Sequence, residues 1–376
     1  MRTIKSLFEN YNFRKYNVFL ILCCIGASVL GILLIGSAKS DLQSRQIQGL
    51  IIGFIAMLVI SLIDYHFILK FYWIIYIFSI ALLILVRLFG DSGGGAKRWF
   101  EIGSFRFQPS ELVKILLILF YAQFIMKHRA VINSIRMITA CFLLVIPLFY
   151  LIFKQPDLST SLMILAIFAV IMYIGGLSYK VILPVIALAV PASIVFFNLV
   201  TREGQTIIND FQQKRILAWL KPDEYASTEA YQQLNSITAI GSGQLNGKGL
   251  NNNVISSVKN GNFISEAQTD FIFTIAGEEL GFIGCCAIII LIFIIVLQCV
   301  LIAAKAEDTA GMIIAGGMAG LLGFQTFINI GVTTMILPDT GLPLPFFSYG
   351  LTSLVSIFIG IGLCLNVGLQ SRDLFE

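Results

Sequence analysis

The sequence predicts an all-α, polytopic integral membrane protein, and three observations lead to this fold class. Of the 376 residues, 57% are hydrophobic and only 12% are charged, whereas about a quarter of the residues in soluble domains are charged. The mean hydropathy of the chain is +0.89. Apolar stretches long enough to cross a bilayer, which takes roughly 17–25 residues, recur along most of the chain. One globular core cannot bury this much apolar surface, so lipid must solvate part of it.

The apolar stretches predict about ten transmembrane helices. They lie at residues 18–37, 47–63, 71–89, 111–126, 136–153, 159–176, 181–200, 270–303, 311–337 and 348–369. The stretch 270–303 is too long for one upright span, so we expect it to tilt or to begin above the lipid. The first stretch lacks a small-residue cleavage site, which indicates a retained span. We expect one transmembrane domain over residues 1–376.

Lysine and arginine in the short connections predict the orientation. With a cytoplasmic N-terminus, more of them fall on the cytoplasmic side than in the short external connections. Both termini are therefore expected in the cytoplasm, and an even number of helices agrees with this. The net charge of +4 is scattered, so nucleic acid is not an expected partner. The seven cysteines lie in apolar runs without metal-ligand spacing, which is typical of small packed side chains.

Two connections are too long to be simple links, and both are predicted to be large extracytoplasmic loops. Residues 90–110 contain three consecutive glycines followed by Lys97, Arg98, Trp99 and Phe100. Residues 201–269 are rich in Gln, Asn, Ser and Gly. Loops of this length in compact proteins are usually functional or disordered. Neither loop is strongly repetitive, so we favour function.

A charged side chain within a transmembrane span has a high free-energy cost in lipid, so such residues indicate either function or pairing inside the bundle. Glu111 and Lys114 are three residues apart and share one helix face. Asp157 lies at the start of the sixth predicted span, on the same external side of the membrane, and could complete a polar network with Lys114. A self-neutralising structural network is the first interpretation, and direct contact of Lys114 with substrate is the second.

Asp270 opens a very apolar helix on the external side and is followed by Glu278 and Glu279, about 12 Å deeper. It could be an ordinary helix-terminal carboxylate or a reactive one. Arg215 could bind a phosphate through the N–H groups of its guanidinium, or it could be a solvated loop residue. His66 and His128 both fall on the cytoplasmic side. An external catalytic base must then be a carboxylate, a lysine or a tyrosine.

Five groups of residues together resemble the SEDS family (shape, elongation, division and sporulation; the RodA/FtsW/SpoVE group), in family order and over nearly the whole chain. The groups are Lys97–Gly103 with Phe107–Lys114, Lys154–Leu158, Gly241–Gly249, Ala267–Phe273 with Gly277–Gly281, and Gly341–Gly350. Two positions depart from the pattern. Gln268 stands where the family often has histidine, and Leu351 stands where a second glycine is common.

This resemblance implies a ten-helix peptidoglycan glycosyltransferase that polymerises lipid II into glycan strands at the outer face of the cytoplasmic membrane. It implies Asp270 as the catalytic residue and a polar network of Glu111, Lys114 and Asp157 beneath the cavity. The implied partners are lipid II, the nascent glycan strand, a class B penicillin-binding protein and membrane lipids. The short N-terminus resembles the elongation member RodA, which implies a role in cell shape.

Several points stay open at the level of sequence. Arg98, Lys114, Arg215 and Gln108 are candidate substrate contacts, the basic ones for the departing pyrophosphate. No cofactor is certain, and a divalent cation (Mg²⁺ or Mn²⁺) could help to bind the diphosphate. The alternative functions are a lipid II flippase or other transporter, a non-catalytic scaffold, and a division or sporulation paralogue.

Overall fold

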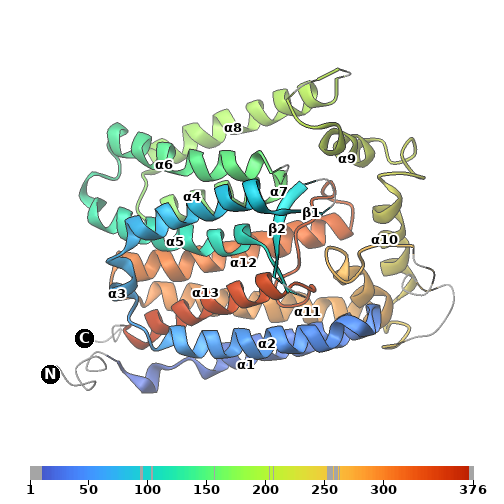
Figure 1. The fold of residues 1–376 in the computed structure, drawn as a ribbon, viewed down its shortest axis with the longest axis horizontal. Helices are drawn as coiled ribbons and strands as arrows, with labels where there is room; N and C mark the ends of the chain where they lie inside the picture. The colour runs from blue at the N-terminus through green and yellow to red at the C-terminus, as the bar shows by residue number, and fades with distance from the viewer. Residues whose placement is uncertain are drawn as a thin grey trace.

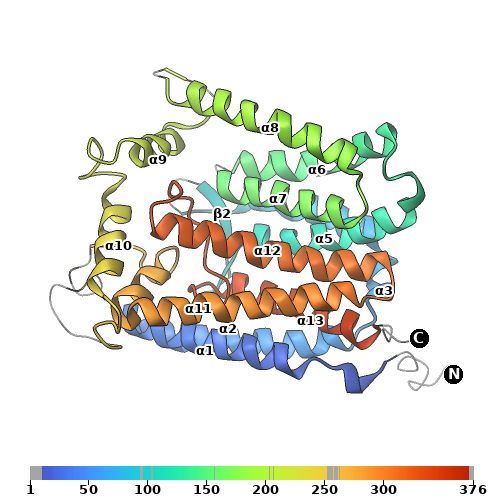
Figure 2. The ribbon, with the colours of Figure 1, turned by 180° about the vertical axis from the view of Figure 1, so that it is seen from behind.

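The computed structural model describes residues 11–371 apart from short gaps, and its helices lie side by side in one elongated bundle (Figures 1 and 2). The gaps are residues 94–95, 103–104, 156, 203, 206, 252–256, 258–260 and 262. Both ends of the described chain lie at one end of the bundle, which we call the terminal end. We call the opposite end, which carries α9 and α10, the loop end.

Within the described residues, nine helices are long and apolar enough to cross a membrane, and one further apolar helix is slightly shorter. They are α1 (Val18–Ala38), α2 (Ser40–Ser61), α4 (Tyr72–Phe89), α5 (Pro109–Lys127), α6 (Ile135–Phe153), the shorter α7 (Leu158–Ile174), α8 (Tyr179–Val200), α11 (Ile272–Ala304), α12 (Thr309–Thr333) and α13 (Leu351–Leu369). The predicted fold class and spans are confirmed. The largest boundary difference is in α2, whose polar first turns are also helical.

The two long predicted loops contain secondary structure that the sequence analysis did not predict. Residues 90–110 form a small antiparallel sheet in the order β1-β2-β3, and the aromatic Trp99 and Phe100 of β2 are residue types enriched in strands. Residues 201–269 include two helices at the loop end. These elements, with the short helical turns, are β1 (Asp91–Gly93), β2 (Ala96–Ile102), β3 (Phe105–Phe107), α9 (Asp210–Leu220), α10 (Tyr231–Ser242), α3 (Tyr65–Leu69), η2 (Phe13–Lys15) and η3 (Arg129–Val131).

Burial differs strongly between helices. α5 and α13 are the most enclosed of the spans, and α12 packs against both. α8 lies along one edge of the bundle (Figure 1), and only Val200 of its residues is buried. Its apolar side chains, such as Leu188, are exposed in the isolated chain. In a bilayer this surface is solvated by lipid, so its exposure carries no penalty.

α11 is interrupted at Gly281, and the segment before it in the chain repairs the interruption. Gly281 has φ +67°, a conformation that favours glycine. The backbone around residues 243–249 supplies four hydrogen bonds across the break. They are Lys248 N to Glu278 O (3.0 Å), Gly249 N to Glu279 O (3.0 Å), Phe282 N to Gln244 O (2.8 Å) and Ile283 N to Leu245 O (3.2 Å). A Cβ on Gly247 would clash with the backbone of Glu279. This long span is therefore divided at Gly281, and its expected tilt or start above the lipid stays a prediction.

Candidate active site

Five charged side chains come together from separate parts of the chain at the loop end, and we call them the carboxylate site. They are Arg98 of β2, Asp157 just before α7, Arg215 of α9, Asp270 just before α11, and Asp339 between α12 and α13. Arg215 Nη2 lies 3.3 Å from Asp339 Oδ2. Arg98 Nη1 lies 3.8 Å from Asp157 Oδ2.

The backbone that presents Asp270 is fixed at three successive carbonyl groups. The bonds are Tyr349 N–H to Gln268 O (2.8 Å), the Ser348 hydroxyl to Thr269 O (2.6 Å) and the Asn329 amide to Asp270 O (2.8 Å). Two of these donors come from the connection between α12 and α13, and the third comes from α12. The backbone that carries the Asp270 side chain is thus held by α12 and by the connection that follows it.

Asp270 and Arg215 meet at Gly341, whose φ is +71°. A Cβ at this glycine would lie 3.4 Å from Asp270 Oδ2 and 3.8 Å from Arg215 Nη1. The carboxylate and the guanidinium group therefore both lie within 4 Å of one point. A side chain at position 341 would strain the backbone and intrude between the two charged groups.

The surroundings of Asp270 favour its neutral form more than is usual for an aspartate. The pKa of Asp270 is raised to about 7, chiefly by burial and also by the carboxylate of Asp339, while the nearby Arg215 opposes these effects in part. Among the described residues, no donor makes a hydrogen bond to the Asp270 carboxylate. A carboxylate with a pKa near neutrality can take and release a proton at physiological pH, which is the requirement for a general base.

Two polar residues of α12 were missed by the sequence analysis. Gln325 and Asn329 are four residues apart and share one helix face. The Gln325 amide donates to Pro343 O (2.9 Å), and the Asn329 amide donates to Leu342 O (2.7 Å). Together they hold the connection that carries Asp339 against the bundle. Uncharged amides within an apolar helix were the signal available in the sequence. Asp339 was harder to recognise from the sequence, because it lies just outside a predicted span, where a charged residue is not unusual.

The structure pairs Glu111 with Lys114 but gives Asp157 another partner. Lys114 Nζ lies 2.9 Å from Glu111 Oε1 and 2.9 Å from Gln325 Oε1, and both charged side chains are almost fully buried. Asp157 accepts a hydrogen bond from Thr160 N (3.0 Å) and pairs with Arg98. Asp157 caps α7, which turns its carboxylate toward β2, so the expected link to Lys114 is replaced by one from Lys114 to α12.

The other predicted substrate contacts lie in different settings. Arg98 is half-buried, its Nε donates to Gln155 O (2.9 Å), and its pairing with Asp157 places it within the carboxylate site. Lys114 is enclosed within the bundle, which favours its structural role over direct contact with a phosphate. Gln108 immediately precedes α5, and its backbone N–H donates to the Thr352 hydroxyl (3.3 Å). This contact connects Gln108 to α13.

The predicted deep carboxylates of α11 are both engaged. Glu278 Oε1 lies 2.8 Å from Lys248 Nζ. Glu279 accepts a hydrogen bond of 2.5 Å from the Ser37 hydroxyl of α1. Both carboxylates are almost fully buried. These contacts link α11 to the 243–249 segment and to α1.

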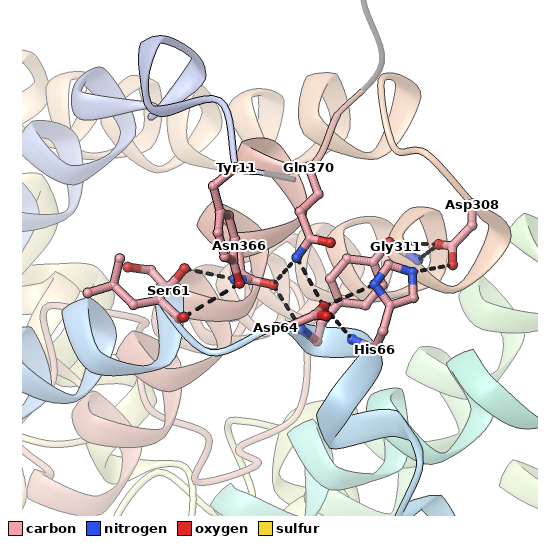
Figure 3. A network of polar contacts seen from close by, with 10 residues as sticks. Tyr11, Ser61, Asp64, His66, Asp308, Gly311, Asn366 and Gln370 are labelled. Atoms are coloured by element: carbon pink, nitrogen blue, oxygen red, sulfur yellow. Dashed lines mark hydrogen bonds and ion pairs between the residues drawn. The ribbon is translucent and has the colours of Figure 1, made fainter. Parts of the chain in front are cut away.

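The histidines lie at the terminal end, away from the carboxylate site. Figure 3 shows the His66 ring between Asp64 and Asp308, at 3.0 Å from Asp64 Oδ1 and 3.1 Å from Asp308 Oδ2. The hydrogen bond to Asp308 is the largest influence on His66 and, against the opposing effect of burial, its pKa is raised to about 9. His128 follows α5, and its ring contacts Phe124 O at 2.8 Å. Neither imidazole can act at Asp270.

The donor set at the loop end bears on the question of a divalent cation. In the part of the chain that the structure describes, no three His, Cys, Asp or Glu side chains form a ready metal cluster. Asp270 and Asp339 nevertheless provide carboxylate oxygens, the ligands that Mg²⁺ and Mn²⁺ prefer. They would suit a cation that also binds oxygens of a substrate.

Known proteins resemble this chain over almost its full length. The model of the FtsW/RodA/SpoVE family, described as cell cycle proteins, matches residues 15–373. The peptidoglycan glycosyltransferase MrdB of Escherichia coli K12 is 32% identical over 352 residues, covering 93% of this chain and 92% of MrdB. The probable peptidoglycan glycosyltransferase FtsW of Geobacter metallireducens is 32% identical over 372 residues, covering 95% and 96%.

Solved structures share the fold. One chain of a peptidoglycan synthase complex that coordinates polymerization and crosslinking superimposes with a TM-score of 0.77 at 28% identity, covering 94% of this chain and 97% of that one. The rod shape determining protein RodA of Thermus thermophilus gives a TM-score of 0.70 at 26% identity, covering 95% and 98%. The chain, whose described residues form a bundle of ten apolar helices with the carboxylate site at one end, belongs to the SEDS (FtsW/RodA/SpoVE) family and is a peptidoglycan glycosyltransferase.

Proposed function

We propose that this glycosyltransferase polymerises lipid II, a disaccharide-pentapeptide on undecaprenyl pyrophosphate, into glycan strands at the outer leaflet of the cytoplasmic membrane. In this orientation the loop end faces outward and both termini lie in the cytoplasm. The distribution of lysine and arginine supports this orientation. So does the concentration of the carboxylate site, the sheet, α9 and α10 at one end of a single transmembrane domain spanning residues 1–376.

The observation that carries the mechanism is the Asp270 carboxylate, held by a fixed backbone next to Arg215. We assign Asp270 as the general base. It takes the proton from the 4-hydroxyl of the acceptor sugar, and the freed oxygen forms a bond to C1 of the lipid-linked donor. The bond between C1 and the pyrophosphate oxygen breaks on the opposite face, which gives the inverted, β-linked product. The proton ends on Asp270, and the electron pair leaves with undecaprenyl pyrophosphate.

Departure of the pyrophosphate requires positive charge. Arg215 is best placed to provide it, because its guanidinium group lies beside Asp270 and is held by Asp339. Arg98, which belongs to the same site through its pairing with Asp157, is a second candidate. A divalent cation would supply further charge when bound, with Asp270 and Asp339 as the side chains to hold it.

The proposed partner is a class B penicillin-binding protein, which would cross-link the strands. A similar chain belongs to a complex that coordinates polymerization and crosslinking. The exposed apolar side chains of α8 and the elements of the loop end offer surfaces within the membrane and above it. We propose that the partner binds there, without any cytoplasmic domain.

We propose a role in cell elongation rather than in division or sporulation. The similarity to MrdB and to a rod shape determining protein supports elongation. The equal identity to a probable FtsW keeps division as the alternative. Expression of the chain in cells depleted of either their elongation or their division member tests this. Recovery of rod shape without recovery of division is the expected result.

The decisive experiment is polymerisation of lipid II by the purified protein, with and without the partner. Glycan strands should form with wild-type protein and nearly disappear with Asp270→Asn. Transport of lipid II across vesicles without strand formation would instead favour a flippase. Wild-type function from Asp270→Asn in cells, with no polymerisation by either protein, would favour a scaffold.

A further inference from the structure

A pocket lined by both polar and apolar side chains lies between α10 and the first half of α11. It has a volume of about 220 Å³. One face of α10 forms one wall, through Asn235, Thr238, Ala239 and Ser242. Phe263 forms part of another wall, and Lys248 and Glu278 complete the lining.

The charged floor of this pocket is rigid. Lys248 Nζ lies 2.8 Å from Glu278 Oε1, and Lys248 N donates to Glu278 O (3.0 Å). These contacts belong to the segment that bridges the break in α11. A pocket whose floor is fixed in this way needs little reorganisation to bind a ligand.

The face of α10 opposite the pocket attaches the helix to the C-terminal end of α12 and to Leu337 beyond it. These contacts do not involve the side chains that line the pocket. Gln233 donates to Val332 O and Leu337 O, both at 2.9 Å. The Ser236 hydroxyl donates to Thr333 O at 2.7 Å. By contrast, Thr238 and Ser242 are exposed. Substitutions on the pocket face should therefore leave the docking of α10 intact.

The lining fits a sugar ring better than a phosphate or an apolar chain. The Thr238 and Ser242 hydroxyls donate to backbone carbonyls of α10, so their oxygens can accept hydrogen bonds from the hydroxyl groups of a sugar. Phe263, which is 38% exposed, offers a flat apolar surface for a ring face. Lys248 is already paired with Glu278, which disfavours an anion. The volume corresponds to roughly seven waters at ~30 Å³ each, a size appropriate to one sugar residue.

We propose that this pocket is a saccharide subsite of the polymerase. The proposal rests on the proposed function and names a second place where that function would hold its substrate. Glu278 lies about 9 Å along α11 from Ile272 at ~1.5 Å per residue, and Asp270 precedes Ile272 by two residues, so a saccharide at the carboxylate site could extend toward the pocket. The sugar could belong to the incoming lipid-linked unit or to the growing strand.

Direct binding tests the subsite without relying on turnover. The probe is a soluble tetrasaccharide of alternating N-acetylglucosamine and N-acetylmuramic acid, added to full-length Asp270→Asn protein in nanodiscs. Phe263→Leu in that background should weaken its binding about five- to tenfold, since one aromatic stacking contact is lost. Thr238→Val, which keeps the shape of a surface side chain, should weaken it less. Ile237→Ala, at an exposed α10 position outside the pocket lining, is the matched control and should bind as the parent does.

Turnover with the same substitutions in wild-type protein then identifies the source of the sugar. A raised KM for lipid II with unchanged strand length assigns the incoming unit. Shorter strands with unchanged KM assign the growing strand. Parent-like tetrasaccharide binding by both Phe263→Leu and Thr238→Val overturns the subsite, even when polymerisation is normal. Absence of polymerisation by wild-type protein would overturn the proposed function and leave the binding result standing.

Discussion

Asp270 and Asp308 are two aspartates at the starts of neighbouring apolar helices, at opposite ends of the bundle, and their electrostatic settings are opposite. Asp308 is the N-cap of α12 and accepts hydrogen bonds from Gly311 N (2.7 Å), the Tyr65 hydroxyl (3.0 Å) and the His66 ring (3.1 Å). Burial acts to raise the pKa of Asp308, but these hydrogen bonds outweigh it and the pKa is lowered. For Asp270, burial and a second carboxylate act together, and its pKa is raised to about 7.

The difference shows that a helix-terminal position does not decide what an aspartate does. Donors directed at Asp308 stabilise its ionised form and make it a structural link between α12 and α3. At Asp270 the donors bind the backbone carbonyl and leave the carboxylate itself available. The protein therefore fixes the position of Asp270 while keeping its affinity for a proton.

The largest expected effect separates the two aspartates. Asp270→Asn keeps the shape but removes the base, so polymerisation of lipid II by purified protein should fall about 10²- to 10⁴-fold. Asp308→Ala should lower thermal stability, since loss of an N-cap costs about 0.5–2 kcal/mol, while the rate of the remaining folded protein stays near wild type. Glu266→Gln is the control for a nearby carboxylate. Wild-type rates from Asp270→Asn would refute the assignment.

A second prediction concerns the buried pair of Glu111 and Lys114, which is connected through Gln325 to the segment between α12 and α13. Lys114→Met leaves Glu111 without its cation, and breaking a buried pair costs about 3–5 kcal/mol. We expect a lower yield of folded protein and a lower unfolding temperature, with activity lost in proportion. Lys114→Met combined with Glu111→Gln should recover much of the stability. A single variant as stable as wild type would show that the pair is not coupled.

The pH dependence of the polymerisation rate tests the raised pKa of Asp270 directly. A general base must be ionised, so kcat should rise with pH and level off above about 7, the pKa of Asp270. Asp339→Asn removes a like charge, which should lower the pKa of Asp270 and bring the plateau at a lower pH. The isosteric variant keeps the hydrogen-bonding shape beside Arg215. An unchanged profile would show that Asp339 does not influence the base.

The smallest expected effect lies at the terminal end. The pKa of His66 is raised to about 9 in the folded protein, above its ordinary value of about 6.5. Its contribution to stability is therefore complete below pH 6.5 and is lost as pH rises through 9. The unfolding temperature of the wild type should fall across this interval, and His66→Gln should flatten the fall. Polymerisation at neutral pH should be little affected, in contrast to every change at Asp270.

The sequence could predict the spans because each depends on its own length and hydropathy, and α5 and α11 begin within about two residues of the expected positions. The position of Asp270 at a helix mouth was predictable for the same reason. The partner of Asp157 was not, because Arg98 and Lys114 are both cations within reach of the same region and only packing chooses between them. Asp339 and Asn329 come near Asp270 through contacts across 59 or more positions, which no local pattern records.

The break in α11 also makes the 243–249 segment part of the helix that it contacts. Four backbone groups of α11, two on each side of Gly281, take their partners from this segment. Each unsatisfied backbone group in a bilayer costs several kcal/mol. The segment therefore cannot leave α11 without exposing these groups, so a side chain at Gly247, which would clash with the backbone of Glu279, should destabilise the helix as well as the loop.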